Sequence, residues 1–137
     1  ETIPDIEDYV VTLLQKAIDL RNTISGRRYS DIILTAQKMI REEYMSEEIS
    51  LNVVAARVCM SPSYFSTIFS KETGKTFIEY LTEVRMEKAK EYLVCTNRKT
   101  SDIAFEIGYK DPHYFSFLFK KTQGCTPKEY RTSRKEW

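Results

Sequence analysis

Apolar side chains recur every three or four positions along most of the 137-residue chain, and this spacing predicts helices. One such stripe predicts a core-facing helix over about residues 30–44, with Ser30 as its N-cap. Another predicts a single long helix over about residues 76–94. Only four Gly and four Pro interrupt these patterns, so we expect an all-α protein.

A heptad seam precedes these helices. Its apolar residues alternate steps of three and four between Ile3 and Ile24, which is typical of a short coiled coil. We therefore expect residues 1–28 to form a linker or dimerisation helix, with homodimer contacts through residues 3–24, ahead of a domain over residues 29–137. Two other interpretations stay open, namely an amphipathic helix packed on its own domain and a signalling helix from an upstream domain. Because the chain does not start with Met, we expect it to be part of a longer protein.

One motif occurs twice, fifty residues apart. Each copy reads Tyr-Phe-Ser-x-x-Phe-x-Lys-x-x-Gly-x-Thr-x-x-Glu-Tyr, starting at Tyr64 and again at Tyr114. Helical solenoids generally need three or more units. Two copies therefore favour a tandem pair of small helical modules.

The first copy lies in a predicted helix-turn-helix unit over about residues 50–75. Ser50 can cap a short first helix, and Ser61 followed by Pro62 is a typical start for a second helix. Gly74 is expected to end that second helix in a left-handed conformation.

The second copy lies in an equivalent unit over about residues 99–124. Thr100 is the expected cap of its first helix, and Pro112 marks the start of its second. The turn between these helices is one residue longer than in the first unit. A last helix is expected over about residues 127–135.

The second helix of a helix-turn-helix can enter the major groove of DNA, so its outward face is the candidate binding surface. In the first unit the inward stripe is Phe65, Ile68 and Phe69, and the outward residues are Pro62, Ser63, Ser66, Thr67 and Ser70. Small hydroxyl side chains allow close approach to base edges, and Thr67 can offer its methyl group to a thymine. The alternative is an ordinary serine-rich surface.

The outward face of the second unit has a different character. Its residues are Pro112, His113, Ser116 and Phe117, opposite an inward stripe of Phe115, Leu118 and Phe119. An exposed Phe needs an apolar contact, such as a thymine methyl group or another protein. Alternatively, Phe117 packs against Tyr109 or the C-terminal helix. His113, the single histidine, is either a groove or phosphate contact or an ordinary surface residue.

Charge is unevenly distributed, although the formal net charge is only +1. Residues 1–56 contain six Lys or Arg against ten Asp or Glu, whereas residues 57–137 contain fifteen against ten. A basic half of this kind indicates a polyanionic partner. We expect phosphate contacts from Lys71, Lys75, Lys120 and Lys121, with further basic residues nearby at Lys128, Arg131, Arg134 and Lys135.

The sequence argues against several other functions. The three cysteines, Cys59, Cys95 and Cys125, lack zinc-ligand or disulfide spacing, so we expect no metal site and a reducing cytoplasm. There is no phosphate-binding glycine loop and no nucleophile motif, so we expect neither an enzyme nor a cofactor. No apolar run approaches the roughly 20 residues of a membrane span. The acidic start of the chain does not resemble a signal peptide.

These motifs resemble the DNA-binding domain of AraC/XylS-type bacterial transcriptional regulators over about residues 30–134. The most specific match reads Ile-Ala-x-x-Ile-Gly-Tyr-x-Asp-Pro-x-Tyr-Phe-Ser from Ile103, then Phe-Lys-Lys-x-x-Gly-x-Thr-Pro-x-Glu-Tyr-Arg from Phe119. The resemblance implies two helix-turn-helix subdomains joined by a long central helix. Their recognition helices are then expected to occupy successive major-groove segments about 34 Å apart.

The resemblance also implies which residues read bases. The family's base-reading positions fall on Ser63, Ser66, Thr67, His113, Ser116 and Phe117. Many members of the family carry Arg where this chain has Phe117. Because Arg favours guanine through bidentate hydrogen bonds, its replacement by Phe favours readout of a thymine methyl group or of DNA shape at that position.

The resemblance further implies a transcriptional activator, with double-stranded promoter DNA and RNA polymerase as partners and a sensor or receiver domain upstream. The alternative from another class is a protein–protein interaction module. In that case the face around Phe117 and the heptad seam bind partners, and DNA contact is secondary.

Overall fold

The computed structural model describes residues 29–134, and every regular element among them is an α-helix. A first helix occupies residues 29–43. The others are α2 (Leu51–Arg57), α3 (Pro62–Thr73), α4 (Phe77–Cys95), α5 (Thr100–Glu106), α6 (Pro112–Gln123) and α7 (Pro127–Arg134). The predicted all-α class with two helix-turn-helix units is confirmed, whereas the heptad seam of residues 3–24 lies outside the described residues. The division of the chain at residue 28 stays a prediction.

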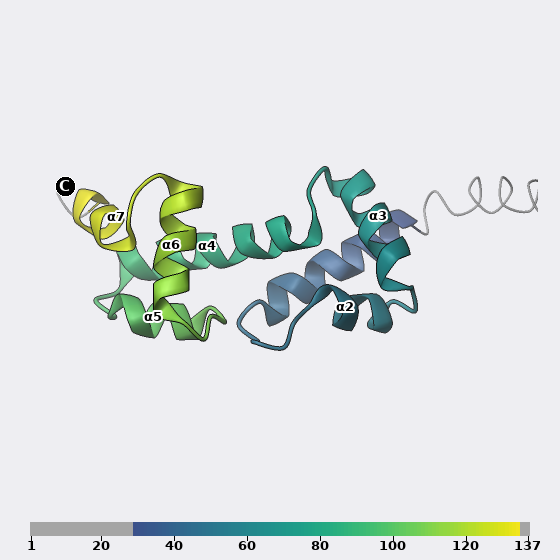
Figure 1. Ribbon diagram of the computed structural model, residues 1–137, viewed down its shortest axis with the longest axis horizontal. Coiled ribbons are helices and arrows are strands. Elements are labelled where there is room, and N and C mark those ends of the chain that lie inside the picture. Colours follow the sequence, from purple (N-terminus) through teal and green to yellow (C-terminus); the bar gives the residue numbers. More distant parts are fainter. Residues whose placement is uncertain (1–28, 135–137) are drawn as a thin grey trace, which may run out of the picture.

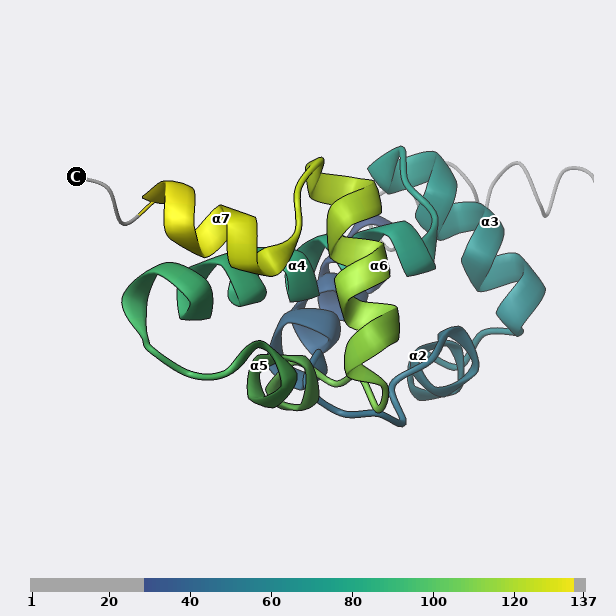
Figure 2. The ribbon, with the colours of Figure 1, turned by 60° about the vertical axis from the view of Figure 1, so that its left-hand side comes forward.

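Helix α4 is the long central helix expected from the sequence. It packs against α3 near one end and against α5 and α7 near the other. Figures 1 and 2 show the α2–α3 unit and the α5–α6 unit at opposite ends of α4, with the 29–43 helix beside the first unit. The two units are therefore connected by one continuous helix.

The two units share an internal scaffold of aromatic rings. In the first, Phe69 packs edge to face on Tyr80, with ring centroids 5.6 Å apart. In the second, Phe119 packs in the same way on Tyr130, at 5.7 Å. Edge-to-face pairs of this kind add to the stabilisation that comes from burying the rings. The sequence repeat is therefore a repeat of packing as well.

Helix caps also repeat. The Thr76 hydroxyl accepts a hydrogen bond from the backbone N–H of Glu79, and Thr126 does the same for Glu129 at the equivalent position of the second copy. At the start of α3, the Ser61 hydroxyl accepts from the N–H of Tyr64. Gly74 and Gly124 end α3 and α6 with φ angles of 74° and 84°, which are left-handed conformations, as expected for Gly74. The capping roles of Ser61 and Gly74 are thereby confirmed.

Two predicted caps were wrong. Ser30 lies within the first helix, because Tyr29 is already helical. The ring of Tyr29 packs on Tyr64, with centroids 6.2 Å apart, which holds this turn in place. Thr100 is the first residue of α5 instead of its cap, and the preceding Lys99 takes the N-cap position without a side-chain hydrogen bond.

The turns inside the two units close by the same backbone hydrogen bonds. The N–H of Met60 donates to Ala55 in the first turn, and the N–H of Tyr109 donates to Ala104 in the second, both at 2.9 Å. Each turn has one residue with positive φ just before this bond. That residue is Gly108, at 106°, in the second turn, but Cys59, at 60°, in the first. A cysteine thus occupies a conformation that favours glycine.

Two arginines bind backbone carbonyl groups at or just after helix C-termini. Arg85 of α4 donates from Nε to Tyr44 and from Nη2 to Ser46, at 2.8 and 3.0 Å. Arg131 of α7 donates from Nε to Leu93 and from Nη2 to Thr96, at 3.0 and 3.3 Å. The expectation that Arg131 belongs to a phosphate-binding group was therefore wrong, because its guanidinium is turned toward the end of α4.

Candidate nucleic-acid interface

Helix α3 presents the outward face predicted from the sequence. Phe65 and Phe69 are fully buried, and Ile68 is buried beside them. On the other side, Pro62, Ser63 and Thr67 are exposed, while Ser66 and Ser70 are half-buried. The predicted orientation of α3 is thus confirmed.

Thr67 has a specific geometry on that face. Its hydroxyl donates to the carbonyl oxygen of Ser63 at 3.0 Å, one turn earlier in the same helix. Since the hydroxyl proton is engaged by the helix, the side chain offers its methyl group and an acceptor oxygen to the outside. Such a side chain suits contact with a thymine methyl group.

Helix α6 has the same orientation with a more apolar surface. Phe115 and Phe119 are fully buried. Among the outward residues, His113 and Phe117 are exposed, and Pro112 and Ser116 are half-buried. Phe117 is 63% exposed, so the alternative in which it packs on Tyr109 or α7 was wrong.

The ring of Tyr109 packs against residues other than Phe117. Its ring lies 5.9 Å from the rings of both Tyr114 and Phe115, and the guanidinium of Arg85 lies 4.8 Å from its centroid. Burial raises the pKa of Tyr109 above its ordinary value of 10.0, because the phenolate would lose hydration. The ring of Tyr109 therefore fixes the base of α6 and leaves Phe117 free of it.

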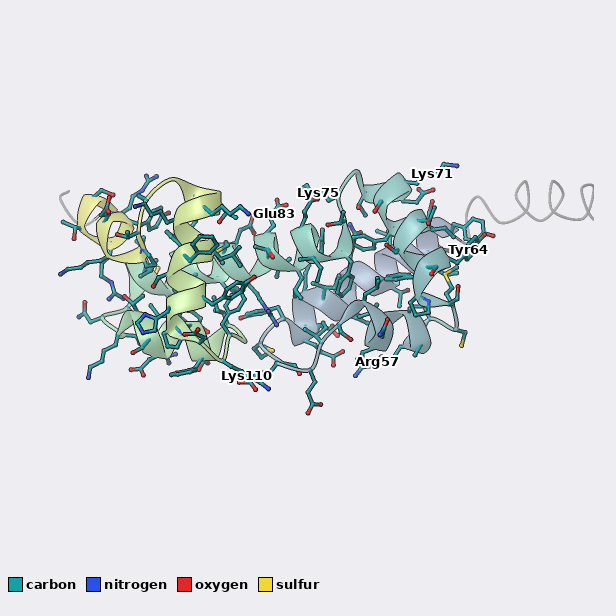
Figure 3. The ribbon with its side chains drawn as sticks, in the orientation of Figure 1. Arg57, Tyr64, Lys71, Lys75, Glu83 and Lys110 are labelled. Carbon is teal, nitrogen blue, oxygen red and sulfur yellow. The ribbon has the colours of Figure 1, made fainter. Side chains whose placement is uncertain are left out.

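The four lysines expected to bind phosphates fall into two groups. Lys71, Lys120 and Lys121 are exposed and form no ion pair with another described residue. Lys75 instead pairs with Glu83 of α4 (Figure 3), and the hydrogen bond to this carboxylate raises the pKa of Lys75. Lys75 must therefore exchange a carboxylate for a phosphate if it binds DNA.

Sequence reasoning missed two exposed aromatic residues on the same helices. Tyr64 and Tyr114 stand in the first turns of α3 and α6, and each is about half exposed. The hydroxyl of Tyr64 is 2.7 Å from that of Tyr29. Both tyrosines open the repeated motif, so the repeat itself was the signal that could have singled them out.

Other kinds of site find little support among residues 29–134. No three His, Cys, Asp or Glu side chains in this range come together to hold a metal ion. Cys59, Cys95 and Cys125 are free thiols. None of the helices in this range is long and apolar enough to cross a bilayer.

Comparison with known proteins agrees with this geometry. A family model described as a helix-turn-helix domain matches residues 54–133, which is more than half of the chain. The C-terminal domain of AraT, a response regulator from Geobacillus stearothermophilus, is 39% identical and superposes with a TM-score of 0.74 over 75% of this chain and 85% of that one. The chain belongs to the AraC-type family of DNA-binding transcriptional regulators.

Curated AraC-type relatives are longer than this chain. The transcriptional regulatory protein YesN of Bacillus subtilis is 39% identical over 105 residues, which cover 74% of this chain and 28% of YesN. The transcriptional activator RhaR of Mannheimia succiniciproducens is 34% identical over 108 residues, covering 78% of this chain and 39% of RhaR. The chain spans between 18% and 44% of the first curated relatives that it matches. Membership in this family does not favour the interaction-module alternative.

Proposed function

We propose that this chain reads two adjacent major-groove segments of promoter DNA, with α3 and α6 as its two recognition helices. The observation that carries the proposal is the repeated geometry. Both helices bury a pair of phenylalanines and turn an outward face that is free of described acidic residues in its first two turns. An acidic side chain there would repel phosphates, whereas these faces are hydroxyl-bearing, aromatic or basic.

We assign sequence readout to the centres of these faces. On α3 the residues are Ser63, Ser66 and Thr67, flanked by Pro62 and Ser70. On α6 they are His113, Ser116 and Phe117, flanked by Pro112. Phe117 has no hydrogen-bonding group, so it contributes through contact with thymine methyl groups or through the shape of the groove.

We assign sequence-independent affinity to Lys71, Lys75, Lys120 and Lys121. Lys71, Lys120 and Lys121 stand in the last turns of α3 and α6. A phosphate backbone would pass near these turns if the helix N-terminus enters the groove. Lys75 joins them once it leaves Glu83. These contacts position the protein and carry little sequence information.

The activity of the whole protein follows as a wider proposal. RhaR is named an activator and AraT a response regulator. We accordingly propose a cytoplasmic transcriptional activator that has a receiver or sensor domain upstream and contacts RNA polymerase. Dimerisation through residues 3–24 belongs to the same proposal.

The test is a fluorescence-anisotropy titration against a randomised duplex pool at two salt concentrations, with sequencing of the bound fraction. We expect enrichment of two short motifs about ten base pairs apart. Lys120→Ala should weaken binding to all duplexes alike and reduce the salt slope by about 0.9. Thr67→Ala and Phe117→Ala should instead change the enriched bases.

Lys38→Ala is the matched control. Its side chain is 75% exposed and stands on the 29–43 helix, so the same charge is removed away from α3 and α6. The assignment of recognition helices is wrong if Lys38→Ala and Lys120→Ala have equal effects, or if Phe117→Ala leaves the enriched motif unchanged. Binding that is absent or insensitive to salt supports the interaction-module alternative.

A further inference from the structure

One charged residue is buried among the residues that the structure describes. Arg85, near the middle of α4, is only 8% exposed. No carboxylate within residues 29–134 forms an ion pair with it. Burying a guanidinium is costly unless its donors are satisfied, so the contacts that satisfy them identify what this residue holds together.

Those contacts join the segment that leads into the first unit to α4. Nε and Nη2 bind the carbonyl oxygens of Tyr44 and Ser46, directly after the 29–43 helix. The Tyr44 carbonyl directly follows the last turn of that helix, where the partial negative charge of a helix C-terminus favours a cation. Arg85 therefore fixes the segment between the 29–43 helix and α2 to the middle of α4.

The same guanidinium also contacts the second unit. It lies 4.8 Å from the ring centroid of Tyr109, and that ring packs on Tyr114 and Phe115 at the start of α6. A continuous set of contacts thus leads from the segment before α2 through one side chain to the base of α6. Lys110, labelled in Figure 3, also forms an exposed ion pair with Glu47 (3.6 Å), and such pairs contribute little.

The approach of the units at this point is close enough to exclude a side chain. A Cβ atom on Gly108 would lie 2.7 Å from Nη2 of Arg85 and 2.8 Å from the carbonyl oxygen of Tyr44. The second turn therefore touches the backbone directly after the 29–43 helix as well as the arginine. Reorienting the second unit therefore changes this contact.

We propose that Arg85 is a positioning residue that sets the orientation of α6 relative to α3, and thereby the spacing between the two DNA segments that the domain accepts. The proposal rests on the proposed function. Inserting one base pair shifts the second segment by about 3.4 Å and turns it by roughly 34° around the helix axis. A rigid pair of units cannot follow that shift, whereas a loosely joined pair can.

The chain contains a matched control for this residue. Arg131 makes the same two kinds of hydrogen bond, from Nε and Nη2 to helix-terminal carbonyl groups. Its partners, however, are Leu93 and Thr96 at the end of α4, beside the second unit, so it does not connect the two units. Arg85→Met and Arg131→Met each remove a guanidinium and keep an apolar stem, but only the first should loosen the pair.

The first measurement needs no DNA. Spin labels are placed at Cys59, in the first turn, and at an introduced Thr122→Cys on α6, in the full chain with Cys95→Ser and Cys125→Ala. We expect the distance distribution between the labels to widen in Arg85→Met and to keep the parent width in Arg131→Met. An unchanged distribution in Arg85→Met overturns the proposal, whatever the DNA result.

The second measurement uses duplexes that carry both enriched motifs, with the spacing varied by up to two base pairs. The parent chain and Arg131→Met should lose about tenfold or more in affinity per inserted base pair, because one set of base contacts is lost. Arg85→Met should bind duplexes of every spacing with affinities that lie within about threefold of one another. A threefold change in affinity is smaller than the contribution of a single base contact. If Arg85→Met keeps the preference of the parent, the proposal is wrong.

Two further outcomes are distinguishable. A parent chain with no preference for paired motifs refutes the proposed function, while the label distances still decide whether Arg85 orients the units. If Arg85→Met does not fold, Arg85→Lys takes its place. It keeps the charge and stem but cannot donate to both carbonyl groups in the fixed geometry of a guanidinium, so we expect the same changes at smaller size, and their absence counts against the proposal.

Discussion

The contact at Gly108 allows a stability prediction that separates backbone strain from steric exclusion. Gly74, Gly108 and Gly124 all have positive φ, at 74°, 106° and 84°. A Cβ on Gly74 or Gly124 would meet nothing within 4 Å, whereas one on Gly108 would meet Arg85 and the carbonyl of Tyr44. The three alanine variants therefore share the conformational cost, and only one of them has a clash.

The magnitudes follow from these geometries. An L-residue in the left-handed region costs about 1–2 kcal/mol, and replacing Gly by Ala returns about 0.4–1 kcal/mol through the unfolded chain. Gly74→Ala and Gly124→Ala should thus lose about 1 kcal/mol. In Gly108→Ala the guanidinium must also shift and lose a hydrogen bond from a charged donor, worth about 1.5–3 kcal/mol. We expect a total loss of about 3–4 kcal/mol.

The assay is urea unfolding of the full chain, followed by far-ultraviolet circular dichroism. With a slope of about 1–3 kcal/mol per molar urea, the Gly108→Ala midpoint should fall by roughly 2 M and the other two by well under 1 M. The reasoning is refuted if Gly108→Ala is no less stable than Gly74→Ala. In that case the contact between the second turn and Arg85 is not part of the folded chain in solution.

Three further predictions concern single side chains. Cys59→Gly should raise stability by about 0.5–1 kcal/mol, because glycine accepts a φ of 60° without strain; Cys59→Ala keeps the strain and should gain nothing, and an equal gain in both variants counts against this explanation. The native state of the parent should lose stability as the pH rises above 10. The raised pKa keeps the Tyr109 hydroxyl protonated in the folded protein, whereas the same hydroxyl ionises in the unfolded chain. Tyr109→Phe should reduce that loss when urea midpoints are compared at pH 9 and 11, and a loss equal to that of the parent would show that burial of this ring is not the cause. Glu83→Gln should free Lys75, strengthen DNA binding a few-fold and steepen the salt slope by up to about 0.9. Glu91→Gln, which removes the partner of Lys88 farther along α4, is its control, and equal slopes for the two variants mean that Lys75 does not bind phosphate.

Much of the local structure could be predicted because its causes lie close together in the sequence. The cap at Ser61 and the ending at Gly74 depend on residues within one turn. The inward and outward faces of α3 and α6 follow from helical periodicity alone. The second copy of the motif repeats the buried phenylalanines and the glycine ending, at Phe115, Phe119 and Gly124.

The features that escaped prediction depend on partners far away in the sequence. Arg131 looked like one more basic residue beside α6, but its hydrogen-bond acceptors lie 38 and 35 residues earlier. Arg85 was part of an ordinary helical pattern, and its acceptors lie 41 and 39 residues earlier. Whether a basic side chain faces solvent or a carbonyl group is decided by tertiary packing, which periodicity does not contain. The positive φ of Cys59 was hidden for a related reason, since no glycine marks that turn.

The two units share an aromatic scaffold but have different outward faces, so the domain has a defined polarity along a duplex. A site read by a serine and threonine face on one side and by His113 and Phe117 on the other cannot be palindromic, so the proposed complex forms in only one orientation along the duplex. Tyr29, which joins the first helix to α3 through Tyr64, lies at the α3 end of the molecule. The end of the domain that carries Tyr29 would then always lie at the same end of the binding site, and reversing the site in a promoter would turn that end the other way along the duplex.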